Sequence, residues 1–444
     1  MKRISINEMT REELALEYRG LLAEYEQVKA ERLALDMSRG KPCREQLDLS
    51  DGILTVLENG DGCFDEKGND TRNYGLPVGI PSARALFAEL CGVAPANVFI
   101  GGCSSLQLMF DAVARAELFG VYPGATPWCK LEKVKFLCPA PGYDRHFRIC
   151  EKFGIEMINV EIGENGPDMD TVERLVSEDE SIKGIWCVPK YSNPTGTVYS
   201  DETVRRFAAL TPAAKDFRIF WDNAYMVHDL YDDAPELLNI FDLTKGTENE
   251  DLVYMFTSTS KITHAGSGVS AFITSEANMK HATEYIGTQI ISYDKVNQLR
   301  HVKFFGNANG IREHMKKHAE FLRPRFEAVL EAFESELAGR DIAAWTKPLG
   351  GYFISLDMLT GSAKRVYDLC LGAGMKLTEA GATYPYGKDP KDTNLRIAPS
   401  YPPLAELRKA AQVLCLCVKL AAAEKKLSEL GFSDGANKNS GASV

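Results

Sequence analysis

Four short apolar segments alternate with helical segments between residues 134 and 222, and this alternation constrains the fold more than any other feature of the sequence. The apolar segments are 134–138, 156–162, 184–188 and 218–222, and the helical segments are 144–153, 168–177 and 202–210. Apolar runs separated by helices are typical of a parallel β-sheet that helices cover on both faces. We therefore predict an α/β fold with a mostly parallel sheet.

Regular structure is also predicted outside this core. Residues 10–32 have helical spacing of apolar side chains, and Thr10 with Glu13 forms a capping box. Further strands are expected at 98–100, 252–256, 352–357 and 394–399, and further helices at 82–90, 106–118, 276–340 and 404–430. The small, polar residues 433–444 are expected to form a flexible tail.

Composition excludes several classes of protein. The formal net charge of −11 argues against a nucleic-acid groove, which needs a basic face. The longest apolar stretch, 413–418, is far shorter than the ~20 residues of a membrane span, and the first residues lack the apolar core of a signal peptide. The 11 cysteines include no C-x-x-C pair and mostly lie in apolar runs, which indicates reduced thiols and a cytoplasmic location.

His314 and His318 are four residues apart in a predicted helix, the spacing of two zinc ligands. The intervening residues lack the glutamate of a zinc-protease motif. We expect no metal here and interpret the pair as part of a solvated helix face.

Lys261 lies in the segment with the most distinctive chemistry. Hydroxyl residues at 257–260 precede it and a glycine-rich turn at 266–268 follows it. Hydroxyls and bare backbone amides suit a phosphate, and a lysine in a confined pocket can attack a carbonyl to form a Schiff base. A surface loop with a solvated lysine is the alternative for this segment alone. The turn also mimics a dinucleotide fingerprint, but an apolar strand at 269–273 follows it where a helix is needed.

Polar residues follow the other predicted strands. Ser104 and Ser105 come after strand 98–100 and a glycine turn, an arrangement that binds anions at a helix N-terminus, although serine is also a common N-cap. Tyr143, Asn193 and Asp222 occupy the ends of three later strands. Ligands of parallel sheets gather outside the carboxyl ends of the strands, so we expect these side chains and Lys261 to share one site.

Together these side chains suit a pyridine aldehyde cofactor. Lys261 can hold the aldehyde as an imine, Asp222 can keep the ring nitrogen protonated, and Tyr143 offers a flat face to the ring. Asn193 and Tyr225 can donate hydrogen bonds to a ring oxygen. Taken singly, Asn193 could be a turn residue and Asp222 a helix N-cap.

The segments NYGLPVG, GGCSSLQ, PAPGYD, SNPTG, WDNAY, STSK and NLRIAP carry a family resemblance over about residues 38–400. The chain resembles the fold-type I pyridoxal 5'-phosphate (PLP) enzymes of the class I/II aminotransferase superfamily. MSRGKP, PGYDRHF and DKVNQLRH resemble its atypical aspartate aminotransferase subgroup. The resemblance implies a large domain at 49–310 with a sheet of the seven-stranded type. It also implies a smaller α+β domain built from 1–48 and 311–432.

The resemblance also implies roles for individual residues. Lys261, Asp222 and Tyr225 would be catalytic, with Lys261 joined to PLP as a Schiff base. The remaining cofactor ligands would be Ser104, Ser105, Ser258, Tyr143, Asn193 and, from the other subunit of a homodimer, Tyr74. Arg396 would bind the substrate α-carboxylate with Asn193 beside it and Gly40 closing over it.

One position departs from the family pattern. The family usually has an arginine seven or eight residues after the lysine, where it pairs with the phosphate. Gly268 and Val269 occupy these positions here. Lys295 and Arg300 are candidates for the missing cation.

A dicarboxylic substrate needs a second cation, and Arg145, two residues past Tyr143, is our candidate, with Lys41 and Lys295 as alternatives. The expected reaction is amino-group exchange between aspartate or glutamate and 2-oxoglutarate or oxaloacetate by a ping-pong route. An aminotransferase for aromatic or neutral amino acids and a PLP-dependent β-lyase remain alternatives. A ligand-sensing transcription regulator is disfavoured because only about forty residues precede the SRGKP segment, too few for a winged helix.

Overall fold

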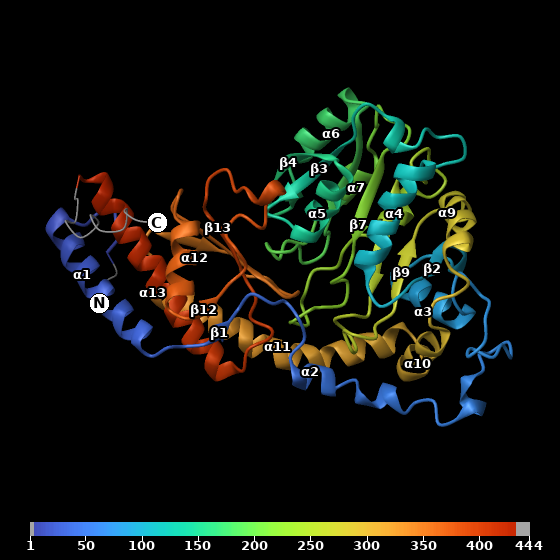
Figure 1. Cartoon of the computed structure of the whole chain (residues 1–444), viewed down its shortest axis with the longest axis horizontal. Helices are drawn as coiled ribbons and strands as arrows, with labels where there is room; N and C mark the ends of the chain where they lie inside the picture. Colours follow the sequence, from blue (N-terminus) through green and yellow to red (C-terminus); the bar gives the residue numbers. More distant parts are fainter. Residues whose placement is uncertain (1–3, 432–444) are drawn as a thin grey trace, which may run out of the picture.

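The computed structural model describes residues 4–431. The predicted flexible tail at 433–444 lies outside them. Figure 1 shows two parts of unequal size, with the larger part around a central sheet and the smaller part around both ends of the described chain. The long helix α11 (Ala308–Glu336) runs along both parts.

The larger part contains an eight-stranded sheet in the order β2-β9-β8-β7-β6-β3-β4-β5. Its strands are β2 (Val98–Ile100), β3 (Lys135–Ala140), β4 (Glu156–Gly163), β5 (Gly166–Pro167), β6 (Ile182–Cys187), β7 (Arg218–Asp222), β8 (Val253–Ser258) and β9 (Ser270–Ile273). The five strands from β8 to β4 are mutually parallel, whereas β9 is antiparallel to both of its neighbours. The predicted mostly parallel sheet is therefore confirmed, and the two-residue β5 is an addition that the sequence did not indicate.

Apolar side chains cover both faces of this sheet, as the continuous apolar runs predicted. On β7, Phe220 packs against Phe136 on one face, with ring centroids 5.2 Å apart, and Trp221 packs against Phe207 on the other at 5.6 Å. Successive residues of a strand point to opposite faces, so a strand buried on both sides must be apolar throughout.

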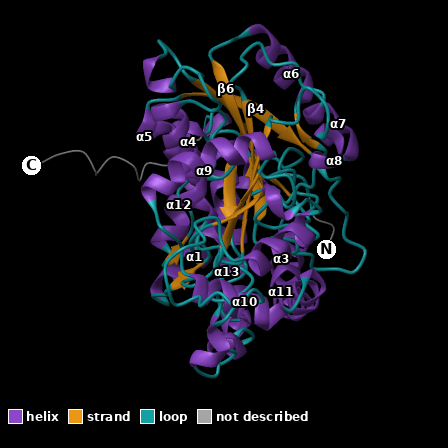
Figure 2. Cartoon of the chain, turned by 90° about the vertical axis from the view of Figure 1, so that its right-hand side faces the viewer, coloured by secondary structure: helices purple, strands orange, loops and turns teal. Residues whose placement is uncertain are grey.

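Helices pack on each face of the sheet (Figure 2). One face carries α3 (Pro81–Cys91), α6 (Met169–Glu178), α7 (Asp201–Ala208), α8 (Ile240–Thr244) and α10 (Lys295–Phe305). The opposite face carries α4 (Ser105–Phe119), α5 (Asp144–Phe153) and α9 (Glu276–Gln289).

The smaller part joins the two ends of the chain. Its three-stranded antiparallel sheet has the order β10 (Ala343–Trp345), β11 (Ile354–Met358) and β13 (Asn394–Ile397), and β1 (Leu35–Asp36) pairs with β12 (Met375–Lys376). The helices α1 (Arg11–Ala30), α12 (Ala363–Gly372) and α13 (Leu404–Glu429) share one apolar cluster with α11 and these strands. The α1 helix lies beside α13 in Figure 1, and its predicted capping box is present. The domain limits given above stay a prediction.

The prediction of a solvated face for His314 and His318 is wrong. Their exposed fractions are 5% and 0%, because this face of α11 packs on the short helix α2 (Arg44–Asp48) and on the turn after Lys261. The two imidazoles lie 3.2 Å apart between their Nε2 atoms, and His314 Nε2 is 3.0 Å from the carbonyl oxygen of Ile262. Burial and the neighbouring His314 lower the pKa of His318 to about 4.

Among residues 4–431 no helix combines the length and apolar character needed to cross a membrane.

Candidate active site

The predicted site residues extend from one edge of the central sheet. Tyr143 follows β3, Asn193 follows β6, Asp222 ends β7 and Lys261 follows β8. Because β3, β6, β7 and β8 are parallel, their carboxyl ends meet at the same edge. Strand β2, which leads to Ser104, runs in the same direction because β9 reverses the chain on both sides.

The turn that carries Lys261 is fixed by its own hydroxyl residues. Thr259 accepts backbone hydrogen bonds from Ile262 and Thr263 through its carbonyl, and its hydroxyl accepts one from the amide of Val269 at 2.9 Å. The Lys261 ammonium nitrogen lies 4.8 Å from the ring centroid of Tyr225. It is 5.9 Å from that of Tyr352, so two aromatic rings border the lysine on this side.

Asp222 is buried at 3% exposure and is only half satisfied. Its Oδ2 lies 3.0 Å from His146 Nε2, whereas its Oδ1 is buried without a hydrogen-bond partner among residues 4–431. His146 is held by stacking on Trp186, with ring centroids 4.4 Å apart and planes 11° apart. A buried carboxylate oxygen without a donor is costly, so a ligand that brings an N–H to this point would fit. The protonated ring nitrogen of PLP is such a donor.

Two tyrosines near Asp222 are held in the neutral form. Burial raises the pKa of Tyr143 to about 12, although the positive charge of Lys261 acts in the opposite direction. Burial also raises the pKa of Tyr225, and the negative charge of Asp222 adds to this effect. At neutral pH Tyr225 therefore carries a proton that it can donate, as the predicted hydrogen bond to a ring oxygen requires.

Two hydroxyl-bearing loops meet in front of helix α4. Ser104 is the N-cap of α4, and its hydroxyl accepts a hydrogen bond from the amide of Leu106. Ser258 donates to Ser260 at 3.1 Å, and Ser260 donates to the carbonyl of Cys103. The structure thus brings the predicted phosphate residues Ser104, Ser105 and Ser258 into one region.

Gly268 is needed where these two loops touch. A Cβ atom on it would lie 3.0 Å from the amide nitrogen of Ser260 and 3.1 Å from the carbonyl oxygen of Cys103. An arginine at this position, as in the usual family pattern, would press on backbone atoms that cannot move away cheaply.

Arg396, on β13, reaches the site from the smaller part of the molecule. Its Nη1 donates to Asp144 Oδ1 at 3.0 Å and to Asn193 Oδ1 at 3.3 Å, and its Nη2 donates to Thr378 Oγ1 at 3.2 Å. Its Nε is buried without a partner among the described residues. Gly40 lies close by, since a Cβ there would come within 2.2 Å of the Phe353 ring on which Arg396 stacks.

Arg145 lies at the rim of this region. Its side chain is 54% exposed, and its Nε is 3.9 Å from Asp144 Oδ2. The alternative candidate Lys41 stacks on Tyr401, with its ammonium nitrogen 4.0 Å from the ring centroid.

Tyr74 and the two candidate phosphate cations, Lys295 and Arg300, make no hydrogen bond to the predicted phosphate serines among the described residues. Tyr74 is 82% exposed. Lys295 is buried and donates to the carbonyl of Asn73 and to Ser292 Oγ, and burial lowers its pKa. One of these partners, Asn73, precedes Tyr74 in the chain, and neither partner is one of the predicted phosphate serines. Arg300 buries its Nε without a hydrogen-bond partner in the described part of the chain.

Three residues of the site were not singled out from the sequence: Asp144, His146 and Tyr352. Asp144 and His146 belong to the PGYDRHF segment and sit on the first turn of α5, one and three residues after Tyr143. His146 shares the buried face of α5 with Phe147 and Cys150. A histidine on an apolar helix face beside a predicted site residue was the available signal.

Comparisons with known proteins agree with this geometry. The family model described as "Aspartate amino-transferase" matches residues 9–429. The aspartate aminotransferase of Corynebacterium glutamicum is 46% identical over 96% of this chain and 98% of the relative.

Solved structures agree as well. The crystal structure of an aspartate transaminase from Corynebacterium glutamicum has a TM-score of 0.92 and 46% identity, covering 95% of this chain and 99% of that one. The α-aminoadipate aminotransferase LysN of Thermus thermophilus, complexed with N-(5'-phosphopyridoxyl)-L-leucine, has a TM-score of 0.70 at 20% identity, covering 92% and 95% of the two chains. The predicted fold is thereby confirmed, and the chain belongs to the aspartate aminotransferase family of transaminating enzymes.

Proposed function

We propose that this protein is a PLP-dependent aminotransferase that moves the amino group between an acidic amino acid, aspartate or glutamate, and oxaloacetate or 2-oxoglutarate. The observation that carries the proposal is the unpaired Oδ1 of Asp222 on the same sheet edge as Lys261. When bound, PLP supplies an electron sink that stabilises negative charge at the substrate Cα. The protein itself must hold the cofactor, place the substrate and move protons.

The cofactor would be held at both ends. Lys261 supplies the amine that bonds to the aldehyde carbon, and Asp222 keeps a proton on the ring nitrogen. His146 positions Asp222, and Tyr143 provides the flat face. The hydroxyls of Ser104, Ser105 and Ser258 and the N-terminus of α4 would hold the phosphate.

Proton transfer at the substrate Cα would fall to Lys261 in its free amine form. The rings of Tyr225 and Tyr352 beside its nitrogen restrict where that amine can move. Tyr225 and Asn193 would donate to the ring oxygen of the cofactor.

Arg396 would bind the substrate α-carboxylate through its unfilled Nε side, with Gly40 and Asn193 next to it. The second carboxylate of an acidic substrate would meet Arg145. The choice of aspartate or glutamate also draws on the Corynebacterium glutamicum relatives, which are named as aspartate aminotransferase and aspartate transaminase. A neutral or aromatic substrate or a β-lyase reaction would not need Arg145.

A homodimer would complete the site. Tyr74 is 82% exposed in a single chain, so a second copy could receive its side chain at the phosphate. All cysteines are free, and apart from Cys103 and Cys129 they are buried, which favours a reducing compartment such as the cytoplasm.

A panel of half-reactions tests the function. Purified protein loaded with PLP is mixed with single amino acids, and the visible absorbance of the bound cofactor is followed. We expect rapid loss of this absorbance with aspartate and glutamate and slow loss with alanine or phenylalanine. Pyruvate and ammonia released from cysteine without an oxo acid would indicate the lyase. Borohydride followed by peptide mass spectrometry should find the cofactor on Lys261, and a different modified lysine would contradict the proposal.

A further inference from the structure

The carboxylate of Asp144 lies between two arginines to which the proposed function assigns substrate carboxylates. Its Oδ1 accepts from Arg396 Nη1 at 3.0 Å, and its Oδ2 is 3.9 Å from Arg145 Nε. Asp144 begins α5 on the central sheet, whereas Arg396 belongs to β13 of the smaller sheet. The contact therefore connects the two parts of the molecule at the mouth of the site.

The Asp144–Arg396 pair is an incomplete one. The side chains are 18% and 10% exposed, so the charges are largely removed from water. An arginine in such a place normally binds a carboxylate with two parallel N–H groups. Here Asp144 takes a single donor, which it shares with Asn193, and the Nε of Arg396 stays unpaired within the described residues. Asp144 thus offsets the charge of Arg396 but leaves its Nε–H without an acceptor.

We propose that Asp144 is an internal carboxylate that pairs with Arg396 while no substrate is bound, and that a substrate carboxylate competes with it for this arginine. The inference rests on the proposed role of Arg396. An incoming carboxylate gains the two-donor contact that Asp144 lacks, and when the ligand has only one carboxylate Asp144 retains Arg145 as a neighbour. Asp144 therefore lowers the affinity for every carboxylate that Arg396 binds, and it keeps Arg396 from remaining an unpaired buried charge between turnovers.

The test measures dissociation constants of two unreactive probes on the PLP-loaded enzyme by calorimetry. Maleate offers two carboxylates, and propionate offers only the one that Arg396 would take. Asp144→Asn keeps the shape of the side chain but removes its charge, and we expect it to bind both probes about tenfold more tightly, the scale of one charge-assisted hydrogen bond. Asp144→Glu restores the charge and should return affinity toward that of the unmodified protein.

A matched control comes from the surface arginine Arg206. Asp170→Asn removes one carboxylate from it. Because Asp170 is not among the proposed site residues, this change should leave both dissociation constants unchanged. Thermal denaturation with and without maleate shows whether each variant is folded. Asp144→Ser replaces Asp144→Asn if the latter does not fold. Unchanged or weaker probe binding in the folded charge-removing variant overturns the inference.

Arg396→Lys separates this inference from the function on which it rests. If Arg396→Lys leaves maleate binding unchanged, the proposed role of Arg396 fails and the inference fails with it. If Arg396→Lys weakens binding while Asp144→Asn does not strengthen it, only the inference about Asp144 is wrong.

Discussion

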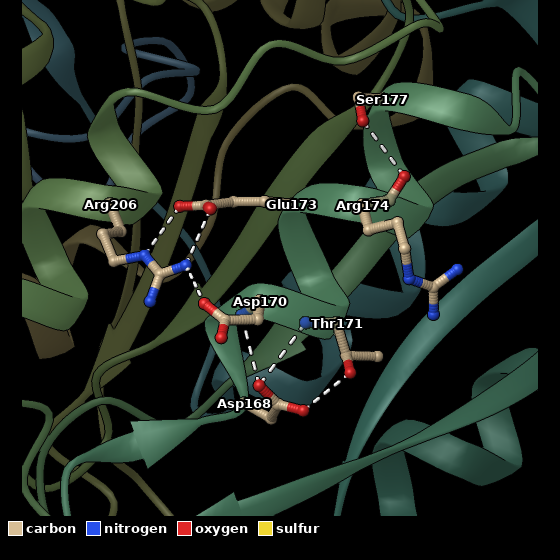
Figure 3. Close-up of polar contacts among 7 residues, drawn as sticks. All are labelled: Asp168, Asp170, Thr171, Glu173, Arg174, Ser177 and Arg206. Carbon is tan, nitrogen blue, oxygen red and sulfur yellow. Dashed lines mark hydrogen bonds and ion pairs between the residues drawn. The ribbon is translucent and has the colours of Figure 1, made fainter.

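Two arginine clusters in this molecule differ in how completely their donors are used. Figure 3 shows Arg206 on α7 paired with Glu173 of α6 and with Asp170. Arg206 donates two parallel hydrogen bonds to Glu173, both 2.7 Å long, and one to Asp170 at 2.6 Å. Arg396 is more deeply buried, yet it has one single-donor contact to a carboxylate and an unpaired Nε. Arg206 binds a carboxylate with two parallel donors and is 30% exposed, so water can reach its remaining N–H groups, whereas the unpaired Nε of Arg396 is buried among the described residues.

This difference is what we expect between a structural ion cluster and a binding site. A guanidinium that pairs with carboxylates and keeps partial contact with water contributes modestly to stability, because water can take up its remaining N–H donors. A buried guanidinium with an unused N–H costs free energy until another acceptor arrives. The unpaired Oδ1 of Asp222 fits the same criterion, which places both incomplete groups on the side where the cofactor and substrate are proposed to bind.

The largest expected effect is that of Arg396→Ala. Loss of the paired N–H donors should lower kcat/KM for L-aspartate by roughly 10²- to 10³-fold, on the order of 3–4 kcal/mol, mainly through KM. Steady-state kinetics measure this directly, and Arg396→Lys should recover part of the loss. A drop of less than fivefold would show that the unused donor does not mark the carboxylate site.

His301 tests whether burial alone predicts function. It is at least as buried as Arg396, but both of its ring nitrogens have hydrogen-bond partners. Its Nδ1 donates to the carbonyl of Asn297 at 2.8 Å, and its Nε2 lies within 3.0 Å of the hydroxyls of Thr259 and Thr263. We therefore expect a structural role for His301, which holds the turn ahead of Lys261.

The pH dependence of stability tests that role. Burial lowers the pKa of His301 from 6.5 to about 4. Between these two pH values the unfolded chain binds a proton at this imidazole and the folded chain does not. Its contribution to the free energy of unfolding is present above pH 6.5 and is lost as pH falls to about 4, by on the order of 3 kcal/mol. Urea denaturation from pH 7 to 4 should show a flatter pH profile for His301→Gln than for the unmodified protein. Identical slopes would contradict the assignment.

Thr378 tests a neutral contact of Arg396. Its hydroxyl accepts from Arg396 Nη2 at 3.2 Å and donates to the carbonyl of Ser38 at 3.2 Å, close to Gly40. Thr378→Val keeps the volume but removes this link, which should cost about 1 kcal/mol of substrate affinity and raise KM about fivefold at nearly constant kcat. A change confined to kcat would instead place Thr378 in the chemical step.

The sequence predicted the sheet and the residues at its edge for a local reason. Apolar runs such as 218–222 mark a strand buried on both faces, and a polar residue that ends the run, Asp222, must lie at the carboxyl end. The α5 helix was predicted too, but its contribution to the site was not. The pairing of Asp144 with Arg396 spans 252 residues, and no local pattern encodes it.

For His314 and His318 the sequence showed the pattern, but the environment predicted for it was wrong. Their helical spacing was visible, but their burial depends on α2 and on the turn at Ile262, which come from distant parts of the sequence. The spacing of polar residues on a helix therefore predicts a shared face, whereas only the tertiary structure decides whether that face meets water or protein.

The smallest expected effect is that of Arg206→Ala, which tests whether Arg206 has a purely structural role. Glu173 is 42% and Asp170 87% exposed, so both carboxylates regain water when the arginine is removed. The free energy of unfolding should fall by about 1 kcal/mol at most, and kcat/KM for aspartate should not change. Urea denaturation and steady-state kinetics on one preparation measure both quantities. If Arg206→Ala reduced activity without reducing stability, two-donor pairing with surface carboxylates would not identify a structural arginine in this fold, and the assignment of Arg396 would lose its physical basis.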